Sequence, residues 1–209
     1  MATTLGEGDS FAIGINNAGQ IVGNLGYGHA VLWNGTIPTA LETLGGPFSG
    51  AAGINDAGQV VGWSYTRNMG RHATLWNGTV PTDLGGGDDS MFSPGSEAIS
   101  INNVGQVVGY SQTTPGGDVH AVLWNGTTLT DLNKYLDPIS VSAGWVLTGA
   151  HGINDAGSIV GTARNLTTDY QQGFLLSVTA VPEPQTYALM LAGIGMVGFA
   201  TRRRKPANA

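Results

Sequence analysis

The chain contains no cysteine. Neither a disulfide framework nor a thiolate metal site can therefore form, although this absence says little about the cellular compartment. Charged residues are also scarce, at 11% of 209 residues, where soluble domains average about a quarter. Thiol chemistry is excluded, and the low charge content directs attention to the few charged residues that are present.

Basic residues are the scarcest charged type, and half of them stand together near the C-terminus. The chain has eight Lys and Arg, four of them at 202–205. Upstream of Pro182, four basic residues remain against thirteen acidic ones, which leaves a net charge of −9. A surface of that sign repels nucleic acid and anionic lipid. We therefore expect no nucleic-acid partner.

Glycine, by contrast, is abundant at 34 residues, which suits an all-β repeat with many tight turns. A ten-residue block built on Gly-Ile-Asn-Asn/Asp-Ala-Gly occurs four times, at 14–23, 53–62, 100–109 and 152–161. A second block, His-Ala-Val/Thr-Leu-Trp-Asn-Gly-Thr, follows the first three copies at 29–36, 72–79 and 120–127, with a degenerate form at 172–176.

Each block predicts a β-hairpin. The first places Asn/Asp-Ala-Gly between apolar runs, and the second places Asn-Gly there, which is the strongest short hairpin signal. Two hairpins in a repeat of about 40 to 50 residues match the size of a four-stranded propeller blade. We predict an all-β, propeller-like array within residues 1–180, with four four-stranded repeats at about 12–46, 51–86, 98–133 and 150–178.

The two ends of the array suggest how it could close. Residues 3–6 (Thr-Thr-Leu-Gly) resemble the closing segment Glu42–Gly45 of the first repeat, and the fourth copy lacks a closing strand after Leu176. Residues 3–6 are therefore a candidate closing strand, which would remove the edges of the array. The alternative is a fragment of a longer, open array.

These blocks resemble the HAF repeat of bacterial extracellular proteins, which is named after a His-Ala-Phe triplet in its second strand. His29, His72 and His120, each followed by Ala, match the triplet with Val or Thr in place of Phe, and Phe174 keeps the Phe. The resemblance covers about residues 3–178. It implies an extracellular repeat protein and supplies no biochemical activity.

The composition changes after residue 178. Val181–Pro184 cannot continue a strand, because proline does not donate to a ladder. Residues 187–200 are uncharged and predict a hydrophobic helix of about 21 Å, at about 1.5 Å per residue. Flanking residues extend it towards the membrane core of about 30 Å. The positive-inside rule keeps the basic residues cytoplasmic and places the repeats outside; these residues are Arg202, Arg203, Arg204 and Lys205.

The order of Pro182-Glu183-Pro184, a short apolar helix and an Arg-rich end resembles the PEP-CTERM sorting signal of Gram-negative bacteria. The resemblance covers residues 181–205 and leaves a short tail at 206–209. It implies that an exosortase cuts near Pro-Glu-Pro after transient insertion in the inner membrane. It also implies delivery to the outer membrane or to the matrix of an exopolysaccharide producer. The alternatives are a plain C-terminal anchor and a buried core helix.

Residues 1–7 contain neither a basic n-region nor an apolar stretch, so they do not read as a signal peptide. Because sorting at the C-terminus requires prior export, we expect either a true start upstream or a truncated gene.

The repeated histidines raise a metal hypothesis, since His29, His72 and His120 share one position. We expect them instead to bond a neighbouring blade, and His151 to be packed. The acidic loop that contains Asp88 and Asp89 is a weak calcium candidate. No cofactor is expected.

Two sets of aromatic residues differ in their relation to the repeat. The in-frame set predicts blade packing; it comprises Trp33, Trp76 and Trp124. The second set lies outside the frame or on loops, where it could stack on sugar rings; it comprises Trp63, Tyr65, Tyr110 and Trp145.

These patterns favour an exported, non-enzymatic component of the surface or of a biofilm matrix that contacts exopolysaccharide. One alternative is a glycan-acting propeller enzyme, which requires a convergent pair of carboxylates. The other is a spacer or adhesin module without a ligand site.

Overall fold

The computed structural model describes residues 3–5, 8–26, 28–86, 89–90, 93–113 and 117–177. The chain divides into two compact units, residues 1–176 and residues 177–209. All described strands lie in the first unit, which confirms the predicted all-β class. Its described helices are one 3-10 turn, η1 (Leu132–Tyr135), and one short helix, α1 (Pro138–Ser142).

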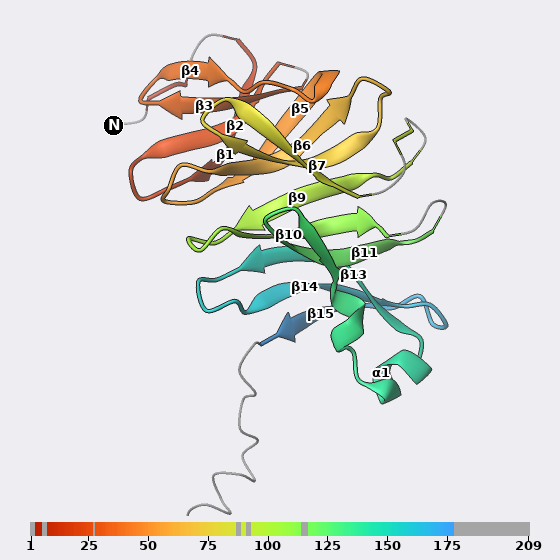
Figure 1. The fold of residues 1–209 in the computed structure, drawn as a ribbon. Coiled ribbons are helices and arrows are strands. Elements are labelled where there is room, and N and C mark those ends of the chain that lie inside the picture. The colour runs from red at the N-terminus through yellow and green to blue at the C-terminus, as the bar shows by residue number, and fades with distance from the viewer. Residues whose placement is uncertain are drawn as a thin grey trace, which may run out of the picture. The chain divides into compact units, whose positions relative to one another are not determined.

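The described strands form four antiparallel sheets, each made of consecutive strands (Figure 1). The first sheet contains β1 (Ser10–Ile15), β2 (Gln20–Leu25), β3 (His29–Asn34) and β4 (Ile37–Ala40). The second contains β5 (Gly45–Ile54), β6 (Val60–Thr66), β7 (Arg71–Asn77) and β8 (Val80–Gly85). The third contains β9 (Ser96–Ile101), β10 (Gln106–Gln112), β11 (Val119–Asn125) and β12 (Thr128–Asp131). The fourth contains β13 (Trp145–Ile153), β14 (Ile159–Asn165) and β15 (Gln171–Leu176).

The repeated blocks form these hairpins for local reasons. The turn between β5 and β6 needs a residue with a left-handed backbone conformation, and Gly58 adopts it with φ +76°. The last residue of Val-Val-Gly must also be glycine, because a Cβ on Gly62 would lie 1.9 Å from the Gly50 carbonyl oxygen. That contact falls beside the irregular pairing between Ala51 and Gly53. The glycine-rich frame thus encodes both the turn and a β-bulge.

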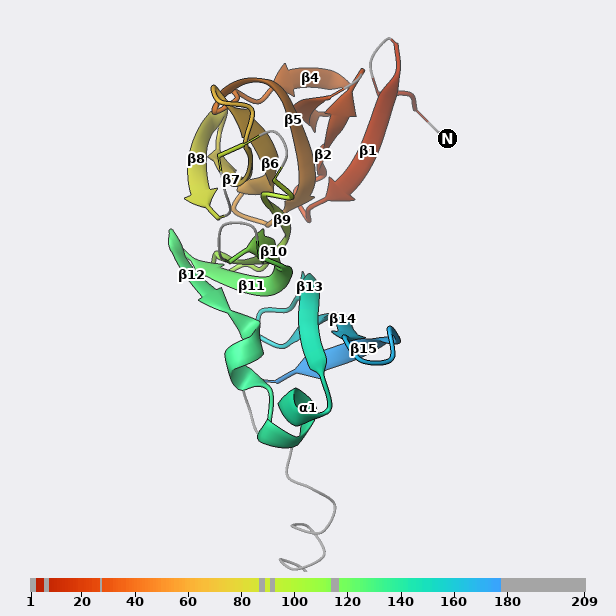
Figure 2. The same cartoon turned by 90° about the vertical axis from the view of Figure 1, so that its right-hand side faces the viewer.

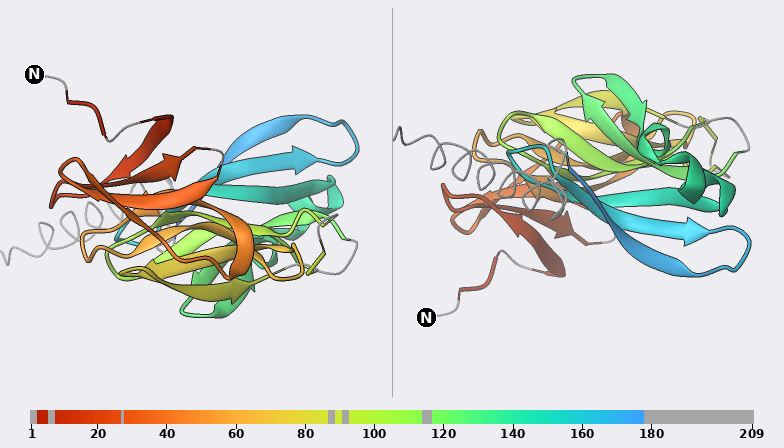
Figure 3. Two further views of the ribbon diagram at one scale, coloured as in Figure 1. Left: turned by 90° about the horizontal axis from the view of Figure 1, so that it is seen from above. Right: turned by 90° about the horizontal axis from the view of Figure 1, so that it is seen from below.

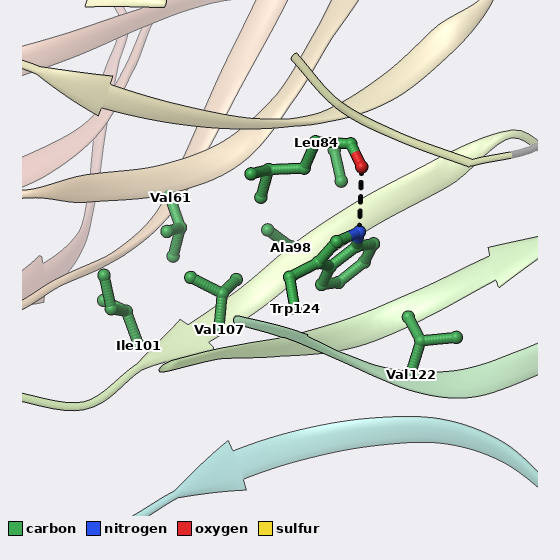
Figure 4. Close-up of a cluster of buried hydrophobic side chains, with 8 residues drawn as sticks. Val61, Leu84, Ala98, Ile101, Val107, Val122 and Trp124 are labelled. Atoms are coloured by element: carbon green, nitrogen blue, oxygen red, sulfur yellow. Dashed lines mark hydrogen bonds between the residues drawn. The ribbon is translucent and has the colours of Figure 1, made fainter. Parts of the chain in front are cut away.

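Each sheet packs on the next through alternating side chains. Val60 and Trp76 pack towards the first sheet, and the adjacent Val61 packs towards the third. Three buried clusters fill the three interfaces between successive sheets. Figure 4 shows the middle cluster, in which Trp124 lies between the second and third sheets.

The three in-frame tryptophans are completely buried, which confirms their predicted packing role. Two of them also tie their sheet to the preceding one. The indole nitrogen of Trp76 donates to the Glu42 carbonyl at 2.7 Å. That of Trp124 donates to the Leu84 carbonyl at 3.0 Å (Figure 4). Trp76 and Trp124 therefore each contribute both apolar burial and a hydrogen bond at the interface.

The predicted ring closure is wrong for residues 3–5. Thr3–Leu5 form no strand, and the Leu5 carbonyl accepts a bond from Ser10 of the first sheet. Thr3 and Leu5 line a hollow together with Ile21 and Thr36 of that sheet, rather than pairing with the last repeat. Figure 2 shows the sheets following one another from β1 to β15, and Figure 3 shows the same sheets from above and from below. Among the described residues they form no closed barrel or propeller.

The place that residues 3–5 take has a physical explanation. In the first repeat, the chain after β4 reaches across to the next sheet, where the Glu42 amide donates to the Thr79 carbonyl. Thr36 is the counterpart of Thr79 in the first sheet, so Thr3–Leu5 lie where a preceding repeat would end. The fourth sheet consequently has three strands among the described residues, with β15 at its edge.

The predicted hydrophobic helix at 187–200 lies outside the described residues. Within the described part of the chain, no helix combines the length and the apolar character needed to cross a membrane.

Candidate functional site

An aromatic cluster with one ion pair lies across the second and third sheets. Trp63 and Tyr65 alternate along β6 and share a face, with ring centroids 5.4 Å apart. Phe48 on β5 meets Tyr65 edge-on, with centroids 6.1 Å apart. We call the cluster of Phe48, Trp63, Tyr65, Arg71, Glu97 and Tyr110 the aromatic cluster.

Arg71 joins the aromatic side chains of the second sheet to the polar groups of the third. Its guanidinium carbon lies 4.5 Å from the Trp63 ring centroid, a cation–π geometry. One terminal nitrogen lies 2.6 Å from a Glu97 carboxylate oxygen, and the other donates to the Tyr110 hydroxyl at 3.1 Å. Tyr110 in turn donates to Glu97 at 2.7 Å. One arginine therefore holds three side chains in a fixed arrangement.

The electrostatics of the cluster keep Tyr110 a hydrogen-bond donor. Burial and the neighbouring Glu97 carboxylate raise the pKa of Tyr110 to about 12. The phenol is therefore protonated throughout the physiological range. The side chains of Arg71 and Glu97 are 29% and 19% exposed, so the pair is partly shielded from water.

Three of the four predicted sugar-stacking residues meet in this cluster, namely Trp63, Tyr65 and Tyr110. They lie on strands β6 and β10 rather than on loops. Trp145, the fourth, begins β13 and packs against the buried cluster between the third and fourth sheets. It does not belong to the aromatic cluster.

Sequence reasoning missed Phe48, Arg71 and Glu97. The predicted second repeat starts at about residue 51 and leaves Phe48 outside it, in a Gly-rich connection, whereas strand β5 begins at Gly45. Arg71 carried a usable signal, because it is one of only four basic residues upstream of Pro182. Glu97 had no such signal, since its contact with Arg71 depends on how two sheets stack.

Two of the in-frame histidines, His72 and His120, bond within their own sheets, so for these two the predicted bond to a neighbouring blade is wrong. His72 Nδ1 lies 2.9 Å from an Asp83 oxygen, and His120 Nδ1 lies 2.6 Å from an Asp131 oxygen. The bond to Asp83 raises the pKa of His72, with burial opposing it. Burial resists ionisation of Asp83, but the bonds from His72 and the Gly85 amide outweigh it and lower the pKa of Asp83.

His151 is exposed, with its Nε2 2.9 Å from the Thr162 hydroxyl, so the predicted packed histidine is also wrong. The calcium candidate is only partly within view, because Asp88 lies outside the described residues. Asp89 accepts hydrogen bonds from the Thr66 hydroxyl and from Asn68 Nδ2. Across the described ranges, no group of three or more His, Asp or Glu side chains could hold a metal ion.

A second repeated feature is a ladder of turns. In each of the first three repeats, the first Asn of the Asn-Asn/Asp turn donates through Nδ2 to the backbone carbonyl of its counterpart in the next repeat. The bonds run from Asn16 to Asn55, from Asn55 to Asn102 and from Asn102 to Asn154, at 3.0 to 3.1 Å. We call this the turn ladder. A polar hollow of about 230 Å³ lies over it.

The second residue of each turn extends the ladder on its exposed side. The backbone amide of Asn17 donates to an Asp56 carboxylate oxygen at 2.9 Å, and the backbone amide of Asn103 donates to an Asp155 carboxylate oxygen at 2.8 Å. The bonds from Asn17 lower the pKa of the Asp56 carboxyl. The alternation of Asn and Asp in the sequence therefore serves contacts between repeats.

The first unit is thus an all-β array of repeats that presents an aromatic cluster and a turn ladder. The family model described as the PEP-CTERM protein-sorting motif matches residues 180–205. It includes the predicted Pro182-Glu183-Pro184 and the basic residues from Arg202 to Lys205, all outside the described residues. No curated protein matches the chain. The predicted sorting signal is confirmed, and it indicates an exported protein that is processed by an exosortase, a membrane enzyme.

Proposed function

We propose that the repeat unit is a non-enzymatic component of the cell surface or extracellular matrix that contacts exopolysaccharide through the aromatic cluster. The carrying observation is that Trp63 and Tyr110 both contact the Arg71–Glu97 pair. Tyr65 packs edge-on against Trp63 beside it. The sorting motif supports delivery to a place where polysaccharide is present. The proposal includes two further points. The repeats are of the HAF type, and residues 187–200 insert in the inner membrane before cleavage.

The composition of the cluster suits a carbohydrate surface. Aromatic rings offer flat apolar faces for the C–H faces of sugars, and a few fixed polar groups bond the hydroxyls. Arg71 covers part of Trp63, so Tyr65 and the exposed Phe48, at 39%, provide the more open rings. Glu97 supplies carboxylate acceptors, and the Tyr110 hydroxyl keeps a second acceptor lone pair, because its proton is donated to Glu97; Arg71 fixes the positions of both.

A binding experiment tests the proposal. The full-length protein is applied to an array of bacterial exopolysaccharides, and Phe48→Ala and Tyr65→Ala are compared with Trp145→Ala. Removing one stacking ring costs about 1–3 kcal/mol by analogy with base stacking on aromatic side chains, or roughly 5-fold to 150-fold in affinity. Trp145→Ala is the matched control, because it removes an aromatic ring outside the cluster.

Equal losses in all three variants, or no binding to any polysaccharide, would contradict the proposal. Release of reducing ends from a bound polysaccharide would favour the glycan-acting enzyme instead. An absence of binding would favour the spacer or adhesin module. The turn ladder supports that second candidate, because it ties all four repeats into one stiff row.

A further inference from the structure

Each later sheet packs one face against its predecessor, and the first sheet leaves the β1 part of this face uncovered, beside the part where Thr3 and Leu5 lie near Ile21. Ile15 is 68% exposed, whereas its counterpart Ile101 in the third sheet is 8% exposed. Ala12 is likewise exposed, whereas its counterpart Ala98 is completely buried. No described residue of another sheet covers this face, so apolar side chains of an interface type remain in water.

Among the residues that the structure describes, none covers the opposite face of the fourth sheet. Val160 is 49% exposed, whereas its counterparts in the three preceding sheets are completely buried against the next sheet. Leu175 on β15 is 65% exposed, whereas its counterpart Leu123 is half-buried in the interface with the fourth sheet. The array therefore ends in two apolar faces that correspond to the two sides of one kind of interface.

Polar groups at the two ends are incomplete in the same way. Trp33 is the counterpart of Trp76 and Trp124, but its buried indole N–H has no acceptor among the described residues. At the other end, the turn ladder runs from Asn102 to Asn154 and reaches no further turn of the described chain. A buried N–H without a partner is costly, so this end lacks a bond that the equivalent tryptophans make inside the array.

We propose that copies of this protein associate head to tail, with the fourth sheet of one copy packed on the first sheet of the next. The occupant is a second copy because the three interfaces within the chain already show the fit. Faces equivalent to that of Val160 pack on faces equivalent to that of Ile15 at each one. Within one copy these faces do not meet, and Figure 2 shows β1 and β15 at opposite ends of the row of sheets.

An interface between unlike faces repeats from copy to copy and produces either a closed ring or a filament. The turn ladder then continues across the joint, with Asp155 of one copy beside Asn17 of the next. Within the chain, neighbouring positions of this kind lie in direct hydrogen-bond contact, as Asn17 and Asp56 do at 2.9 Å. Cysteines at positions 17 and 155 therefore meet only across a head-to-tail joint.

Disulfide trapping tests the proposal directly, because the natural chain has no cysteine to interfere. Full-length Asn17→Cys and Asp155→Cys proteins are mixed in mild detergent, oxidised and analysed on non-reducing gels, with mass spectrometry of the linked peptides. Asp56→Cys replaces Asp155→Cys in the control mixture, since Asp56 is equally exposed but lies inside the array. The expected yield of the 17–155 link is at least ~10-fold above the control mixture and above either variant alone.

A second measurement does not depend on trapping. Sedimentation velocity of the full-length protein should show assemblies that Ile15→Glu and Val160→Glu each dissociate, because either charge would be buried at the joint. Val80→Glu is the control, since Val80 is a 59% exposed residue of β8 in the second sheet, inside the array. A 17–155 link no more abundant than the control link would overturn the proposal. So would a monomer at every concentration, which would mean that another partner, or none, covers these faces.

Discussion

Trp63 and Tyr110 occupy the same position in successive repeats, directly after Val-Val-Gly, and this shared position brings them to one site. Neither residue belongs to the set of in-frame tryptophans that predicts blade packing, and this was enough to predict both as surface aromatics. It does not show that Arg71 bridges them, because Arg71 reaches Tyr110 and Glu97 across two sheets. Contacts of this kind depend on the stacking of sheets, and local patterns contain no information about that.

The His72–Asp83 pair should make stability depend on pH. The pKa of His72 is raised above 6.5, so its contribution is complete below pH 6.5 and is lost as the pH rises through the higher folded-state pKa. The pKa of Asp83 is lowered below 3.8, so its contribution is present above pH 3.8 and is lost as the pH falls through the lower folded-state pKa. The pair therefore contributes most between these two values.

The measurement is the free energy of unfolding in urea for the natural protein and for His72→Gln, from about pH 5 to about pH 9. The difference between the two proteins should shrink as the pH rises above 6.5. His29→Gln is the matched control, because Ala40 takes the place of Asp83 in the first sheet. A difference that does not change with pH would exclude the pair as its source.

At the scale of the strand and turn, the frame of the repeat was predictable because its signals are local. A turn glycine and an Asn that bonds its own turn act within a few residues. Asn55 illustrates both the local and the long-range part of this role. Its Oδ1 accepts from the Gln59 amide at 2.9 Å, and its Nδ2 donates to the Asn102 carbonyl of the next repeat at 3.1 Å. Only the first bond could be expected from the sequence.

Asn55→Ala should destabilise the protein strongly. Asn55 is 4% exposed, and its removal leaves the Gln59 amide and the Asn102 carbonyl without this partner. The Asn102 carbonyl keeps its bond from the Gly105 backbone amide, whereas the Gln59 backbone amide is left unpaired. A buried group left unpaired costs about 1–3 kcal/mol, so we expect a loss of about 1–3 kcal/mol in chemical denaturation.

Asn154→Ala is the control for this prediction. Asn154 is exposed, and its side chain accepts only the Ser158 amide bond among the interactions of the described chain. Its substitution should cost about 1 kcal/mol or less. Equal losses for Asn55→Ala and Asn154→Ala would show that the contact between repeats contributes nothing to stability.

At the scale of the whole molecule, ring closure was predicted from a likeness between residues 3–6 and the closing segment Glu42–Gly45. The two segments do occupy corresponding places, but the prediction paired residues 3–6 with the fourth repeat instead of the first sheet. A closing segment contacts the sheet that follows it in the chain, as Glu42 contacts Thr79. Residues 3–5 accordingly lie against the first sheet. Whether four repeats close into a ring depends on the angle between successive sheets, which the repeat sequence does not reveal.

The sorting motif gives the last prediction, which concerns the protein in its cell. Replacing Pro182, Glu183 and Pro184 together by Ala should abolish cleavage, because these residues form the part of the matched segment near which an exosortase is expected to cut. The uncleaved chain should then remain with the inner membrane, held there by its apolar and basic residues. Immunoblots of fractionated cells measure both effects through chain length and location.

Pro206→Ala, just beyond the matched residues 180–205, is the control and should be processed normally. Normal processing of the triple variant would show that the Pro-Glu-Pro residues are not what the exosortase reads.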